Sequence, residues 1–175
     1  MNIYHFTREK KLYGILNNDK LKAGDIFKYG YAHKTFKELP MGEIISFTRN
    51  FSLNSTIDTD VCLVFDRDKI SQNYKLIPYN DYPNKKKSFT WWSEAEEIIN
   101  ATEIKLSRYI KEIIIFKTEP KTFNYHFNKD FSSMEEVVDY IEKTYDIKTR
   151  YIPFLNTEIN KRKYMKSYEN FNPDK

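Results

Sequence analysis

The sequence has one cysteine, Cys62, and only three histidines among 175 residues. A single cysteine allows no intramolecular disulfide, and the histidines do not have the spacing that zinc sites use. We therefore expect no metal cofactor and no disulfide framework. Cys62 lies within the apolar run over residues 61–65, which predicts a buried, unreactive thiol.

Glycine and proline are also scarce, with four and six residues, whereas tyrosine and phenylalanine number fourteen and thirteen. A chain this rich in aromatic residues is not expected to be disordered, despite its many polar residues. Its length suits one domain with its own core. We expect that domain over residues 1–155, followed by a polar tail over 156–175 that frays.

Long apolar runs are the third shortage. No run approaches the roughly 20 residues that cross a bilayer, and the first residues lack the apolar centre of a secretory signal. The expectation is a soluble, cytoplasmic protein with no membrane partner. The net charge of +4 permits a polyanionic partner without requiring one.

The hydrophobic pattern predicts short strands and a few helices in irregular order. Thr7 is an acceptable N-cap for a helix that carries Leu12, Ile15 and Leu16 on its apolar side. Ser132 and Glu135 have the spacing of a capping box at the start of a later helix. Strands are expected over 3–6, 43–48, 61–65, 74–77, 109–117 and 151–155. Because strands and helices do not alternate, the pattern favours an α+β fold with a split, mostly antiparallel sheet and flanking helices.

Three short motifs follow one another at wide spacing: Tyr-His-Phe-Thr at 4–7, Ile-Ser-Phe-Thr-Arg at 45–49 and Glu-Ala-Glu-Glu-Ile-Ile at 94–99. Their order over residues 1–120 resembles that of the ADP-ribosyltransferases, and within them the branch whose first motif residue is His. That branch includes the DarT-type DNA-modifying toxins, the rifampicin-modifying enzymes and the RNA 2′-phosphotransferases. In the family, a first strand presents a His and then a Thr before a helix. A middle strand carries a Ser/Thr motif or an aromatic residue, and a late strand starts at the catalytic Glu.

The resemblance implies an ADP-ribosyltransferase-like fold in a small phage or bacterial protein of toxin-like type. NAD would be its co-substrate, and ADP-ribose would pass to a macromolecular acceptor, either protein or nucleic acid. Cleavage of the nicotinamide–ribose bond passes through an oxocarbenium-like state, which a nearby carboxylate stabilises. Glu96 matches that carboxylate. Glu94 completes the Glu-x-Glu form of arginine-modifying members, in which the earlier acid helps to activate the acceptor.

The same resemblance implies which residues bind NAD. His5 would bind the adenosine ribose, and the backbone beside it at Phe6 would bind the nicotinamide carboxamide. Thr7, Ser46 and Thr48 would order the site through hydrogen bonds, Arg49 would meet the pyrophosphate, and Tyr29, Tyr31 or Phe47 would stack on the nicotinamide ring.

Some alternatives remain open at this point. On an extended segment Glu94 and Glu96 share a face and Glu97 lies on the other, whereas on a helix all three acids form a solvated first turn. Three lysines at 85–87, which most often form a solvated turn, allow a nucleic-acid acceptor, and Glu94-x-Glu96 allows a protein arginine. A glycohydrolase that releases nicotinamide without an acceptor, and a non-catalytic binding or inhibitor module, are the competing functions.

Overall fold

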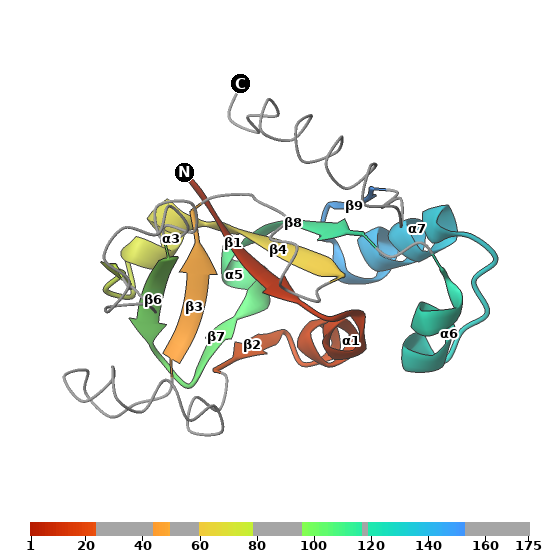
Figure 1. Cartoon of the computed structure of the whole chain (residues 1–175), viewed down its shortest axis with the longest axis horizontal. Helices are drawn as coiled ribbons and strands as arrows, with labels where there is room; N and C mark the ends of the chain where they lie inside the picture. The colour runs from red at the N-terminus through yellow and green to blue at the C-terminus, as the bar shows by residue number, and fades with distance from the viewer. Residues whose placement is uncertain (24–43, 50–59, 79–95, 117–118, 153–175) are drawn as a thin grey trace, which may run out of the picture.

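The computed structural model describes residues 1–23, 44–49, 60–78, 96–116 and 119–152 (Figure 1). Within these, seven strands form one sheet in the order β5-β6-β3-β1-β4-β8-β9. All neighbouring pairs are antiparallel except β8 with β9. The strands are β1 Asn2–Thr7, β3 Ile44–Thr48, β4 Val61–Asp66, β5 Ile77–Pro78, β6 Glu96–Asn100, β8 Ile110–Ile115 and β9 Thr149–Tyr151. The predicted α+β class with a mostly antiparallel sheet is therefore confirmed.

A second sheet of two strands, β2 Lys20–Lys22 and β7 Glu103–Lys105, lies outside the main sheet. Leu21 and Ile104 are directly opposite each other and both are buried. The strands were not predicted, because three residues are too few to show a period of two. Strand β2 follows helix α1 (Glu9–Asn17) directly in the chain.

The main core lies between the sheet and the helices α1, α6 (Lys121–Phe127) and α7 (Met134–Tyr145). Two shorter helices are α3 (Arg67–Ser71) and α5 (Leu106–Tyr109). All five residues over 61–65 are buried, and they alternate between two apolar clusters on opposite faces of the sheet. Cys62 has no exposed surface and burial raises the pKa of its thiol, as expected for an inert cysteine.

Two helix starts differ from the predictions by one residue. The N-cap of α1 is Arg8, not Thr7, because Thr7 completes β1 with a buried side chain. The N-cap of α7 is Ser133, whose Oγ accepts from the Glu136 N–H, so the Ser132–Glu135 capping box is wrong. The Glu136 carboxylate instead accepts from the backbone N–H and the hydroxyl of Ser132.

The strand predicted over 109–117 begins later, since Leu106–Tyr109 forms the helical turn α5 before β8. Helix α6 was not predicted. In the part of the chain that the structure describes, no helix has the length and apolar character needed to cross a membrane.

Candidate functional site

The three sequence motifs belong to three adjacent strands. β3 lies between β1 and β6 in the sheet, and Figure 1 shows β3 beside β6 with β1 crossing next to them. Tyr4 pairs with Thr48, which in turn pairs with Glu96, the first residue of β6. Segments more than eighty residues apart in the chain thus meet in one part of the sheet.

His5 is attached to the middle motif by a side-chain hydrogen bond. Its Nδ1 lies 2.9 Å from the carbonyl oxygen of Ser46. A carbonyl only accepts, so Nδ1 carries the proton and Nε2 is left as an acceptor. β1 and β3 share a single register pair, Tyr4 with Thr48, whereas β1 and β4 share six. The imidazole therefore adds a link between β1 and β3 beyond that pair.

The environment of His5 keeps the ring uncharged at neutral pH. Loss of solvent is the main cause of its lowered pKa, and the positive charge of Lys11 lowers the pKa further. The bond to Ser46 acts in the opposite direction but does not outweigh them. A neutral imidazole with a free acceptor nitrogen suits a ligand hydroxyl group.

Phe47 has a different role from the predicted one. Its side chain is 1% exposed and its ring packs edge-on against Phe65, with ring centres 5.4 Å apart. It also lies edge-on to His5, with ring centres 6.2 Å apart. An enclosed ring cannot stack on nicotinamide, so Phe47 is a core residue that supports the imidazole. Phe6 packs against the second apolar cluster, on the opposite face of the sheet.

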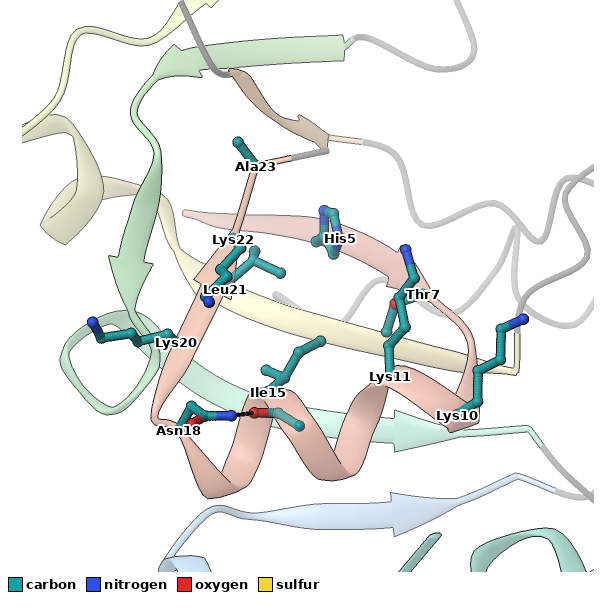
Figure 2. Close-up of a pocket in the computed structure, with 11 residues that line it drawn as sticks. His5, Thr7, Lys10, Lys11, Ile15, Asn18, Lys20, Leu21, Lys22 and Ala23 are labelled. Atoms are coloured by element: carbon teal, nitrogen blue, oxygen red, sulfur yellow. Dashed lines mark hydrogen bonds between the residues drawn. The ribbon is translucent and has the colours of Figure 1, made fainter. Parts of the chain in front are cut away.

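Beside His5 is a pocket of about 430 Å³ between β1, α1 and β2 (Figure 2). This volume lies within the range of small-molecule sites. The lining residues are His5, Thr7, Lys10, Lys11, Gly14, Ile15, Asn18, Lys20, Leu21, Lys22 and Ala23. Among the described residues, four lysines and no acidic residue line the pocket, so this part of it is electropositive.

Glu97 lies on the same face of the sheet as His5 and forms an ion pair with Arg67. Glu97 pairs with Phe47 in the register, so residue 97 shares the face of Phe47 and His5. Both oxygens of the buried Glu97 carboxylate accept from Arg67, at 2.8 Å from Nε and 2.8 Å from Nη2. Arg67 was not singled out by sequence reasoning, because nothing near it in the chain indicates its partner.

The remaining predicted residues are placed as follows. Thr48 is half-buried at the end of β3, and Arg49 follows it as an exposed residue. Ser46 contributes its backbone carbonyl to His5. Glu94, Tyr29 and Tyr31 lie outside the described residues.

Sequence reasoning also missed the lysines of the pocket. Lys10 and Lys11 lie in the first turn of α1, and Lys20 and Lys22 lie on β2. Their convergence depends on Asp19, which adopts a left-handed conformation (φ 52°) and directs β2 back from the end of α1. A polar residue at a helix end is the only local signal of that turn.

Comparisons with known proteins add no assignment: no protein-family model matches the chain, and no curated protein matches its sequence. Within the described ranges, no group of three His, Cys, Asp or Glu side chains is arranged to hold a metal ion.

Proposed function

We propose that the protein is a mono-ADP-ribosyltransferase that cleaves NAD and transfers ADP-ribose to a protein or nucleic acid. The observation that supports this proposal is the adjacency of β1, β3 and β6, the strands of the three motifs, with His5 bonded to the carbonyl of Ser46 and lining a pocket. The finer assignment of an ADP-ribosyltransferase-like fold is part of the same proposal.

The proposed reaction breaks the bond between nicotinamide and C1′ of the ribose. Nicotinamide leaves with the bonding electron pair, and an acceptor nucleophile forms the new bond to C1′ and releases its proton. The Nε2 atom of His5 accepts a hydrogen bond from a ribose hydroxyl, since Nδ1 is committed to Ser46. A carboxylate at the start of β6 stabilises the positive charge that develops on the ribose.

We assign that carboxylate to Glu96 because it matches the motif of the resemblance, although the register places residue 96 on the face of Tyr4 and Thr48, opposite to the face of His5. Glu97 shares a face with Phe47 and His5, but both of its oxygens already accept from Arg67. A carboxylate whose charge is already compensated by a bidentate arginine is less able to stabilise a new positive charge. Glu94 would help to activate the acceptor.

The test is incubation of the protein with labelled NAD and cell lysate. Nicotinamide release and mass spectrometry of the labelled product report cleavage and acceptor together. Glu96→Gln is expected to reduce turnover by roughly 100-fold or more, because it removes charge stabilisation from the transition state. Glu135→Gln, on the exposed side of α7, is the matched control and leaves turnover unchanged.

Other outcomes of this test have definite meanings. If Glu97→Gln abolishes turnover in a folded protein and Glu96→Gln does not, the assignment of the acid is wrong and the reaction class stands. Nicotinamide release without transfer of label identifies a glycohydrolase. Neither release nor transfer, with retained binding of nucleic acid, identifies a non-catalytic module.

A further inference from the structure

The main sheet has a second apolar face, opposite to the face that packs on the helices. Strands β1, β4 and β8 and the residue after β9 form its cluster, which consists of Tyr4, Cys62, Val64, Ile114, Phe116 and Ile152, with Phe6 packed against them. The helices α1, α3, α5, α6 and α7 all contribute their buried residues to the other cluster. In the part of the chain that the structure describes, the helices therefore cover only one face of the sheet.

The second face is nevertheless shielded from solvent within a single chain. Each buried member of its cluster is at most 7% exposed, and Cys62 has no exposed surface. An ion pair lies on the same face, because Glu112 pairs with Val64 and Arg150 with Ile114 in the register. Its two charged atoms, Glu112 Oε1 and Arg150 Nε, are 2.9 Å apart, and the glutamate side chain is 14% exposed. Side chains on an uncovered sheet face contact water, so other residues of this chain must lie over this face.

We propose that the segment 153–175 docks on this second face and covers it, with Leu155 and Ile159 as its first apolar contacts. The inference goes beyond the proposed reaction and does not rest on it. Ile152 belongs to the cluster, and its N–H donates to the Ile115 carbonyl at 2.9 Å. The chain therefore enters the segment from the border of this face. Leu155 and Ile159 follow Ile152 by three and seven residues.

Other segments outside the described residues connect to different places. Segments 24–43 and 79–95 lead into β3 and β6, and neither strand contributes a residue to the cluster. Segment 50–59 leads into β4, which contributes Cys62 and Val64, so this segment is the competing cover. A second copy of the chain is not needed, because the cluster is already buried in one copy.

The docked segment would also secure the strand that carries His5. Neighbouring residues of a strand point to opposite faces, so Tyr4 and Phe6 face the second cluster while His5 and Thr7 line the pocket on the other side. The segment would thus hold β1 from behind without entering the pocket. The expectation of a frayed tail over 156–175 would then be wrong.

The experiment uses Cys62 as a probe, because it is the only cysteine of the chain and pairs with Phe6 and Ile114 within the cluster. The rate at which the thiol reacts with DTNB is measured in the whole, native chain. A thiol with no exposed surface reacts only when its cover opens. Leu155→Ala and Ile159→Ala are each expected to raise this rate roughly tenfold, because a smaller apolar contact favours opening.

The double variant with both alanines is expected to react faster than either single variant. Urea denaturation of each variant measures global unfolding, so a thiol reaction faster than global unfolding reports local opening. Lys161→Ala, which shortens a polar side chain of the same segment, is the matched control and leaves the rate unchanged.

Three results would overturn the proposal. The first is a reaction rate that is the same in wild type and in the double variant. The second is a rate raised by Leu53→Ala or Ile57→Ala but not by the C-terminal variants, which assigns the cover to segment 50–59. The third is a wild-type rate that falls as the protein concentration is raised, which assigns the cover to a second copy of the chain.

Discussion

At neutral pH the imidazole of His5 is uncharged, with its proton on Nδ1 and its lone pair on Nε2. Both properties come from neighbours that are distant in sequence. The Ser46 carbonyl fixes the tautomer, and burial together with Lys11 lowers the pKa. A residue that looks like any lone histidine in the sequence is thereby prepared to accept a hydrogen bond.

The lowered pKa predicts how stability depends on pH. An unfolded histidine titrates near 6.5, so between that value and the lower folded pKa the unfolded state holds more protons. The contribution of His5 to stability is therefore complete above about pH 6.5 and is lost as the pH falls through the folded pKa. Urea denaturation at pH 7.5 and pH 5 should show a smaller loss of unfolding free energy in His5→Asn than in wild type.

His5→Asn is a suitable control because its side-chain amide can still donate to the Ser46 carbonyl but does not titrate. An NMR titration of the imidazole protons checks the same point directly in the wild-type protein. A midpoint at or above 6.5 would contradict the burial of His5.

At the scale of a single element, the N-terminus of α7 shows why the sequence pattern placed the N-cap one residue too early. Two serines in a row, each followed three residues later by a glutamate, offer two equivalent capping boxes. Ser133 becomes the N-cap, because its Oγ accepts from the Glu136 N–H, whereas the Ser132 hydroxyl donates to the Glu136 carboxylate. The sequence pattern alone does not choose between the two serines.

Ser133→Ala should lower the free energy of unfolding by about 1 kcal/mol, the usual cost of losing an N-cap oxygen. Ser132→Ala should cost less, since its backbone N–H keeps its bond to the Glu136 carboxylate. Urea denaturation of the two variants measures the difference. A larger cost for Ser132→Ala would show that the helix begins where the sequence pattern first suggested.

At the scale of the whole molecule, the Arg67–Glu97 ion pair connects opposite parts of the sheet. Glu97 is on β6 and Arg67 begins α3 directly after β4, with β3 and β1 between those two strands. The bidentate bond thus spans the strands that carry His5 and Ser46. Because Glu97 is buried, removing Arg67 leaves a carboxylate without solvent or partner.

Arg67→Met is expected to lower the free energy of unfolding by about 2–4 kcal/mol, and Arg67→Met with Glu97→Met should recover much of that loss. A double-mutant cycle by urea denaturation measures the coupling. Asp68→Asn, which breaks the exposed pair between Asp68 and the N-terminal amine, is the control and should change the midpoint little. Additive losses from the two Met substitutions would contradict a coupled pair.

The sequence by itself determined much of the secondary structure. The apolar run at 61–65 predicts β4, and the helical spacing of apolar residues after Thr7 predicts α1. The irregular order of the elements predicts the α+β class. These predictions succeed because the spacing of apolar residues along the chain shows which side of an element is buried. It also marked His5 and the segment 45–49, which lie on adjacent strands.

Only the tertiary structure decided which side chains face one another. The backbone turn at Asp19 brought the lysines of α1 and β2 around one pocket, and the strand register set Glu97 on the face of Phe47 and His5. Packing enclosed Phe47 in the core and paired Arg67 with Glu97. Such contacts depend on register and on the direction of each chain segment, and neither leaves a local pattern in the sequence.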